Sequence, residues 1–470
     1  MRKIYIIGTM AILFAACKPS VNITKPPTPG SADFSNYMAV GNSLTAGSMD
    51  NSLSVSGQLN SYPERLFEQF SLVQGTKGAK GPFIQPLLNS DDGYPSAKFV
   101  LGMTYNSCIP GDSSLAPIPY PGWVANAADA TYTSPANNGQ INNIAVPGIR
   151  VVDYKVAGYA GIAQELMGLP YANRFYHDPT QTPLYELQYT VNNLYPTFFT
   201  LWLGINDVLL YGASGGQGHD ASTATFLPAG LVGVSNFYSP YDISPLSAFD
   251  SGYDAALNVA ISTGADGALI NIPDITALPF FTTIPANGLT LSRQGQADTL
   301  NGIWGGAAFT KVFQVGANYF IIQDHNGNTR QAVPGELILL TTPQDSITCA
   351  GWGTLKPIPD QYVLTTDEIQ FIEWAITNYN AYILQEAQLH HLAYVDMNTY
   401  LKQVATGIVF NGVNYNAQFV NGGAFSLDGI HPTQRGYALI ANQVISTINS
   451  FYGSTLPSVD VNKYHGVNFP

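Results

Sequence analysis

The chain has 470 residues, of which 46% are hydrophobic and only 10% are charged, and its formal net charge is −13. This hydrophobic content excludes a disordered chain and allows a substantial core, in one large domain or two ordinary ones. Lysine and arginine form no cluster, so nucleic acid is not an expected partner, because its binding depends on neutralising phosphates. The 28 tyrosines and the low charge instead favour neutral ligands, such as sugars or apolar esters.

The first residues predict export. Arg2 and Lys3 precede an apolar run at residues 4–14, which is too short for a comfortable membrane span and is typical of a signal peptide, here residues 1–16. Small residues stand directly before Cys17, an arrangement that resembles a bacterial lipoprotein signal in which this cysteine becomes lipidated. Lipidation would anchor the exported protein in a bilayer, on the periplasmic or extracellular face of the outer membrane or cell surface. Plain signal cleavage near the same place is the alternative.

Residues 17–33 are rich in proline, serine and threonine, which predicts an extended tether. No second linker and no repeat follows, so we expect residues 34–470 to form a single domain. Long segments interrupt this domain at about residues 71–140, 211–245 and 280–362. Loops this long inside a compact domain are usually functional, and we expect them to build the walls of a substrate cleft.

The last of these insertions predicts a β-hairpin, because residues 319–322 and 336–340 flank the turn sequence Asn326-Gly327-Asn328. His325 belongs to the same turn pattern, and we expect it to be a turn residue rather than a ligand. The chain has no C-x-x-C, no H-E-x-x-H and no calcium-loop pattern, so we expect no metal.

Cys108 and Cys349 are the only cysteines besides Cys17. In an oxidising compartment two such residues form a disulfide or remain as two buried thiols. The sequence leaves both alternatives open.

Five short apolar runs predict the strands of a parallel sheet. They are continuous rather than alternating, as expected for strands that are covered on both faces. Helical patterns lie between them, and this alternation implies right-handed crossovers and a three-layer α/β/α sandwich. The runs are residues 37–40, 143–146, 197–203, 268–272 and 392–395.

The clearest helical pattern covers residues 367–391. Its start carries Thr365 and Glu368 at the spacing of a capping box. The last helix is expected over about residues 433–451, with Pro432 suitably placed at its entrance.

Residues able to carry chemistry follow the predicted strands. Ser43 comes after the first run, Gly148 after the second and Asn206 after the third. Ligands of parallel α/β sheets bind outside the carboxyl ends of the strands, so we expect these residues at one edge. Asp428 and His431 lie on the loop before the last helix, which can fold back over that edge. Together these segments offer a nucleophile, a base and an orienting carboxylate.

The sequence around these residues resembles the SGNH, or GDSL, hydrolase family. The resemblance covers roughly residues 34–452 without the insertions, and it implies a flavodoxin-like sandwich with a five-stranded parallel sheet. Asn42 is a departure, since the family usually has Asp there, and we expect altered hydrogen bonding around the serine turn. The four blocks, in the family's order, are Gly41-Asn42-Ser43-Leu44, Asn143-Ile144-Ala145-Val146-Pro147-Gly148, Gly204-Ile205-Asn206-Asp207 and Asp428-Gly429-Ile430-His431-Pro432.

The resemblance implies a serine esterase that needs no cofactor. Ser43 would attack an ester carbonyl while His431 takes its proton, and Asp428 would hold the imidazole. The Ser43 N–H, the Gly148 N–H and the Asn206 amide would bind the oxyanion, and water would clear the acyl-enzyme. Structural alternatives remain: serine, asparagine and aspartate are common helix caps, and Pro-Gly is a common turn.

Two substrate classes compete within this reading. One is a short acyl group such as acetyl on a glycan, which the low charge and the abundant tyrosine slightly favour; the other is a longer acyl chain on a lipid. A different class of function is a surface binding lipoprotein that kept the fold and lost turnover. Acyl transfer to an alcohol is a further alternative, because the same acyl-enzyme can be intercepted by an acceptor other than water.

Overall fold

The computed structural model describes residues 25–132, 140–227, 237–305 and 313–469. The predicted signal peptide and Cys17 lie outside the described residues. Within these ranges no helix is both long enough and apolar enough to cross a membrane.

A four-stranded parallel sheet lies at the centre of this mixed α/β protein. Its order is β1 (Tyr37–Gly41), β4 (Phe198–Trp202), β5 (Asp266–Ile270) and β13 (Ala393–Val395). Every residue of β1 and β4 is buried, as expected for strands covered on both faces. Four of the five predicted runs are therefore strands, each within two residues of its predicted ends.

The remaining run, residues 143–146, does not form a strand. It makes one isolated parallel bridge to β1, between Asn143 and Ala39. Beyond this bridge the Val146 N–H still donates to the Gly41 carbonyl (3.1 Å), but no second bridge is completed in the part of the chain that the structure describes, so the segment lies along β1 as an irregular edge. The segment still runs along the outer side of β1. Among the described residues the sheet itself has four strands, so the expected fifth strand is not formed.

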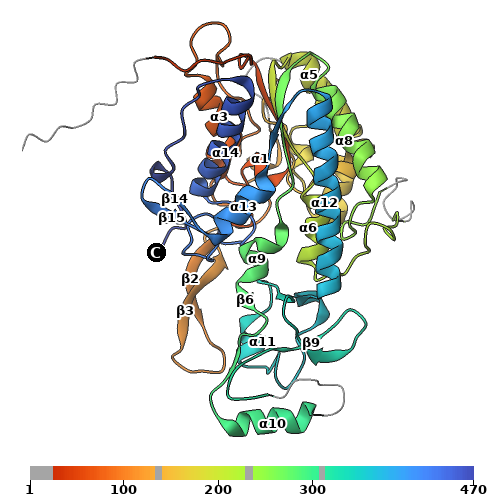
Figure 1. The fold of residues 1–470 in the computed structure, drawn as a ribbon, viewed down its shortest axis with the longest axis vertical. Helices are drawn as coiled ribbons and strands as arrows, with labels where there is room; N and C mark the ends of the chain where they lie inside the picture. Colours follow the sequence, from red (N-terminus) through yellow and green to blue (C-terminus); the bar gives the residue numbers. More distant parts are fainter. Residues whose placement is uncertain (1–24, 133–139, 228–236, 306–312, 470) are drawn as a thin grey trace, which may run out of the picture.

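Helices pack on both sides of the sheet, and Figure 1 shows the strands between two groups of them. One group contains α3 (Tyr62–Phe70) and α14 (Gln434–Tyr452), and the other contains α5 (Pro183–Leu194), α8 (Leu246–Ala260) and α12 (Thr366–Leu389). Further helices are α1 (Ser43–Ala46), α2 (Val55–Leu59), α4 (Tyr159–Met167), α6 (Asn206–Ala213), α9 (Pro279–Thr282), α10 (Gln294–Trp304), α11 (Gln344–Thr348) and α13 (Met397–Thr406).

The insertion at residues 280–362 has a hydrophobic cluster of its own, separate from the main core. Its hairpin has the predicted tip but a different second strand: β9 (Ile321–Gln323) pairs with β10 (Thr329–Gln331). Asp324 explains the early return, because its carboxylate accepts hydrogen bonds from the Asn326 and Asn328 N–H groups and closes the turn at once.

The predicted second strand of that hairpin belongs to another sheet. β11 (Leu337–Ile338) lies between β6 (Ile284–Pro285) and β12 (Val363–Leu364), so it joins the two ends of the insertion. The other short strands are β2 (Phe99–Tyr105), β3 (Ser113–Pro119), β7 (Leu289–Leu291), β8 (Gly316–Asn318), β14 (Ile408–Phe410) and β15 (Val413–Tyr415).

A disulfide joins two insertions. Cys108, at the tip of the β2–β3 hairpin, is bonded to Cys349, at the end of α11, across 241 residues of chain. Figure 1 shows this hairpin extending beside the insertion that contains α11. The two insertions are thus held together covalently below the main sheet.

Removing this cross-link should destabilise the protein. The double variant Cys108→Ser/Cys349→Ser is expected to lose about 2–4 kcal/mol in the free energy of unfolding, because the unfolded chain regains the entropy of a long open loop. Urea unfolding followed by tryptophan fluorescence measures this loss. Dithiothreitol should lower the midpoint of the wild type and leave that of the double variant unchanged; equal midpoints for the two proteins without reductant would contradict the prediction.

Candidate active site

Ser43 is the first residue of α1 and follows β1 directly. The helix is capped by Asn42 and not by Ser43: the Asn42 Oδ1 accepts a hydrogen bond from the Leu44 N–H (3.1 Å). Among the described residues the Ser43 Oγ has no hydrogen-bond partner, and the residue is 7% exposed. The serine hydroxyl is therefore not used in folding the turn.

The two polar atoms of the Asn42 side chain have different environments. Its side-chain oxygen performs the cap, while its Nδ2 is buried and has no partner among the described residues. A buried donor without an acceptor costs about 1–3 kcal/mol. The turn that holds Ser43 therefore carries a local energetic cost.

Asp428 and His431 are brought together. The His431 Nδ1 lies 2.8 Å from the Asp428 Oδ2, and the backbone N–H groups of Ile430 and His431 donate to the Asp428 Oδ1 (both 2.8 Å). Burial alone would raise the pKa of Asp428, but the nearby imidazole and these donors outweigh it, so its pKa lies below the ordinary value. Asp428 is an ionised carboxylate that fixes the imidazole.

A tight turn shortly after α1 holds the Asp428 loop. Met49 and Ser52 exchange backbone hydrogen bonds (2.9 and 3.1 Å), and the two residues between them have positive φ angles, 56° at Asp50 and 63° at Asn51. The positive φ angles at both central residues are those of a type I′ turn. The Asn51 N–H donates to the Asp428 Oδ2 (2.7 Å), the oxygen that also faces His431. The segment that follows Ser43 is thereby bonded to the His431 loop.

Asp50 makes two further hydrogen bonds between this turn and the loop that precedes His431. Its N–H donates to the Ser426 Oγ (2.9 Å), and its Oδ1 accepts from the Leu427 N–H (3.0 Å). Burial, and to a lesser degree the nearby Asp428, raise the pKa of Asp50 to about 7. The sequence analysis missed this residue; the signal was an Asp-Asn pair, the two residue types besides glycine that best tolerate a left-handed backbone.

The candidate oxyanion donors come from three neighbouring loops. Asn206 begins α6 just after β4, is 4% exposed, and donates from Nδ2 to the Ile149 carbonyl (2.9 Å), which ties it to the loop of Gly148. Neither the Ser43 N–H nor the Gly148 N–H has a hydrogen-bond partner among the described residues. Gly148 has φ 83°, a left-handed conformation that favours glycine.

A buried ion pair fixes the loop after Gly148. Arg150 and Asp153 form a salt bridge (2.8 Å) with side chains 0% and 1% exposed. Asp207 accepts from the Val151 N–H (2.8 Å) and from the Ser244 Oγ (2.7 Å), and burial raises its pKa to about 7. Asp207 is thus a structural hydrogen-bond partner. Arg150 and Asp153 were not found from the sequence.

The third insertion adjoins the His431 loop. The Phe280 N–H donates to the Gly429 carbonyl (3.0 Å), and the Leu340 N–H donates to the Phe280 carbonyl (2.9 Å). Both Phe280 and Phe281 are buried, so they are core residues rather than an open aromatic platform.

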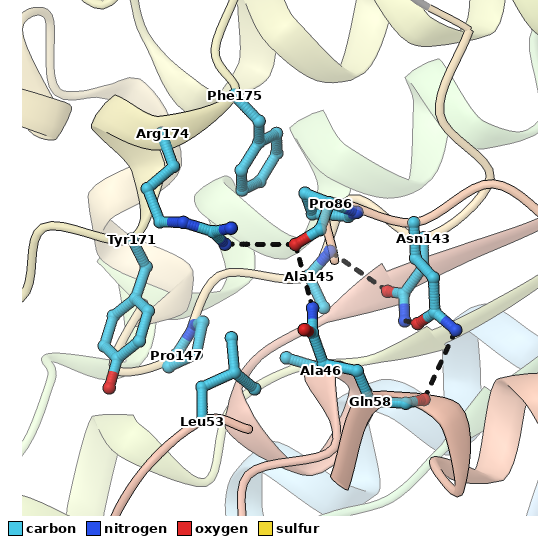
Figure 2. Close-up of a pocket in the computed structure, with 11 residues that line it drawn as sticks. Ala46, Leu53, Gln58, Pro86, Asn143, Ala145, Pro147, Tyr171, Arg174 and Phe175 are labelled. Carbon is cyan, nitrogen blue, oxygen red and sulfur yellow. Dashed lines mark hydrogen bonds between the residues drawn. The ribbon is translucent and has the colours of Figure 1, made fainter. Parts of the chain in front are cut away.

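Figure 2 shows a small cavity beside α1, lined by Ala46 and by Pro147 of the glycine block. Its volume is about 10 Å³, which is room for one water molecule at most. The side chains of Arg174 and Gln58 converge there on the Pro86 carbonyl (3.0 and 2.9 Å). This cavity is a packing feature and is too small for an ester substrate.

Comparisons with known proteins add little. No family model matches the sequence, and no curated protein matches it either. Among solved structures, the chain is similar to a crystal structure of a "putative GDSL-like lipase" from Parabacteroides merdae, with 9% sequence identity, 90% of this chain and 99% of that chain covered, and a TM-score of 0.31. A likeness at this level carries no conclusion about the site.

Replacing Asp50 tests its protonation. Its folded-state pKa is raised, so the stability it contributes is fully present below the unfolded value of about 4 and is lost as pH rises toward 7. Asp50→Asn keeps an oxygen for the Leu427 N–H and removes the charge. The free energy of unfolding of the variant, relative to wild type, should therefore rise between pH 4 and 7 and level off above it.

Urea titrations at several pH values measure this difference. The control is Ser262→Ala, at an exposed position without a titratable group, for which the difference from wild type should stay flat. Parallel curves for wild type and Asp50→Asn would show that Asp50 does not titrate in this range.

Proposed function

We propose that the chain is a serine hydrolase of the SGNH/GDSL type, with the three-layer α/β/α sandwich of that family, which cleaves a carboxylic ester. The observation that carries this proposal is the imidazole of His431. Its Nδ1 faces an ionised carboxylate, while its Nε2 has no hydrogen-bond partner among the described residues. With the proton on Nδ1, the lone pair of Nε2 is free to take a proton from a nucleophile.

Ser43 is the nucleophile in this proposal. Its hydroxyl is unused by the fold, and the turn at Asp50 and Asn51 bonds the segment after it to the loop of the base. Ser43 Oγ attacks the ester carbonyl as its proton passes to His431 Nε2. Because Ser43 and His431 make no hydrogen bond in the described structure, substrate binding has to bring them into contact, as is common for hydrolases without a bound ligand.

The oxyanion of the tetrahedral intermediate needs fixed donors. The Ser43 and Gly148 N–H groups are unpaired, and the Asn206 amide has a second N–H beyond the one that binds Ile149. Losing one such donor typically costs about 10²–10³ in rate. His431 then protonates the leaving alcohol, and water hydrolyses the acyl-enzyme.

A short acyl ester on a neutral glycan is the preferred substrate, because a chain with only 10% charged residues suits uncharged rings better than ionic ligands. Longer acyl esters are the alternative within the same chemistry. A binding protein without turnover is the competing function, and the missing contact between Ser43 and His431 is what favours it.

The decisive measurement is hydrolysis of p-nitrophenyl acetate by the full chain and by Ser43→Ala. Turnover should fall by about 10⁴-fold or more in the variant, because the nucleophile is lost. Covalent labelling by a fluorophosphonate should disappear with it. The matched control is Ser262→Ala, at an exposed position, which should keep full activity.

No turnover and no labelling of folded wild type would favour the binding protein. A rate that climbs with acyl length beyond about eight carbons would favour the lipid ester over the acetyl group.

We also propose that the protein is an exported lipoprotein attached to a bilayer through Cys17. When the full chain is made in a bacterial host, wild type should partition into the detergent phase of Triton X-114, because a lipidated cysteine carries long apolar chains. Cys17→Ser should partition into the aqueous phase. An aqueous wild type would reject the lipid anchor and leave plain cleavage of a signal peptide.

A further inference from the structure

A second group of chemistry-bearing side chains lies away from the candidate active site. His325, Asp360 and Glu368 each offer one ligand atom, and these atoms all lie within 4.8 Å of one another. The three residues come from the tip of the β9–β10 hairpin, from the single turn Asp360–Tyr362 and from the first turn of α12. Figure 1 shows β9 beneath the start of α12.

Two carboxylate oxygens in this group are buried without a partner. Glu368 is 5% exposed; its Oε2 accepts from the Thr365 N–H (2.7 Å) and Oγ1 (2.8 Å), while its Oε1 has no hydrogen bond among the described residues. The Asp360 Oδ1 is buried in the same way. A carboxylate oxygen only accepts hydrogen bonds, so each of these atoms requires a donor, a proton or a cation.

Among the described residues, no arginine or lysine forms an ion pair with Asp360 or Glu368. The nearest arginine in the insertion, Arg330, is engaged by Glu336 (2.5 Å) and lies 3.6 Å from Asp324. Asp360 accepts a hydrogen bond from the neutral side-chain amide of Gln217, and the His325 Nδ1 lies 3.7 Å from the Asp360 Oδ2.

Access to the group is open. His325 and Glu368 line a surface cavity of about 350 Å³, whose walls also include Asp324 and the Glu336-bound Arg330, while Asp360 does not line it. Such a cavity admits a hydrated ion and leaves room for the waters that would complete its coordination.

We propose that His325, Asp360 and Glu368 bind one divalent transition-metal ion, such as Zn²⁺ or Mn²⁺. One imidazole nitrogen and two carboxylate oxygens form a mixed donor set that suits these ions, whereas Ca²⁺ and Mg²⁺ prefer oxygen alone. Ligand atoms around such an ion stand about 3–4 Å apart, so small side-chain movements suffice. The ion joins the hairpin tip to α12 and has a structural role, independent of ester hydrolysis.

Isothermal titration of the EDTA-treated full chain with ZnCl₂, MnCl₂ and CaCl₂ tests this proposal. Wild type should bind one equivalent of Zn²⁺ or Mn²⁺, and saturation should raise its midpoint of thermal unfolding. Glu368→Gln keeps an oxygen for Thr365 and removes the charge, and it should weaken binding at least tenfold. His325→Asn, at an exposed turn, should do the same without risk to the fold.

The control is His390→Asn, at the other end of α12, which should bind the metal as wild type does. Failure of all three ions to bind would overturn the proposal, as would binding that neither Glu368→Gln nor His325→Asn weakens. Binding of Ca²⁺ alone would overturn the assignment to a transition metal. None of these readouts depends on esterase activity.

Discussion

The carboxylate of Asp428 is the point on which the candidate site depends. One of its oxygens accepts from Asn51 and His431 Nδ1, and the other accepts from the Ile430 and His431 N–H groups. The contact with Asn51 joins residues 377 positions apart in the chain. A buried carboxylate is costly unless its oxygens are satisfied, and here each oxygen has donors from fixed backbone or from the imidazole. The same bonds that keep Asp428 ionised therefore also set the ring of His431 and bring the two ends of the domain together.

Side-chain amides and carboxylates connect the other loops of the site to one another. Asn143 donates to the Thr45 carbonyl (3.0 Å) and so links the glycine loop to α1, while Asn206 donates to Ile149 and Asp207 accepts from Val151. Buried polar groups that are fully paired specify one arrangement of a loop, because every alternative leaves a donor or acceptor unpaired. These loops are thus positioned by side-chain hydrogen bonds as well as by two charged features, the ionised Asp428 and the buried Arg150–Asp153 pair.

Four strands and the main helices could be predicted from the sequence. Continuous apolar runs that alternate with amphipathic helical patterns are best buried as parallel strands covered by helices on both faces. The start of α12 could also be predicted, because the hydrogen bond between Thr365 and Glu368 joins residues only three positions apart. The predictions are wrong where the backbone conformation is determined by a local side-chain hydrogen bond or by contacts with a segment far away in the sequence. The segment predicted as a strand at residues 143–146 makes one isolated bridge to β1, and Asp324 closes a hairpin early. The turn at Asp50 is a short Asp-Asn pair whose function depends on a loop at the other end of the chain. The turn pattern at His325 was read correctly, but its neighbours Asp360 and Glu368 come from other segments and carry no joint signal in the sequence.

The insertion at residues 280–362 is in direct contact with the loop that carries Asp428 and His431. Its described residues share a hydrophobic cluster of their own, so they pack against one another rather than forming a loose loop. Its first residues pack on Gly429, where φ is 72° and an added Cβ would lie 2.8 Å from the Phe280 nitrogen. Gly429 therefore permits a close approach of the insertion to the turn between Asp428 and His431. The far side of the insertion is fixed by the disulfide to the β2–β3 hairpin. The insertion is therefore held between two contacts, the disulfide to the β2–β3 hairpin and the backbone hydrogen bond from the Phe280 N–H to the Gly429 carbonyl (3.0 Å) in the turn that orients His431.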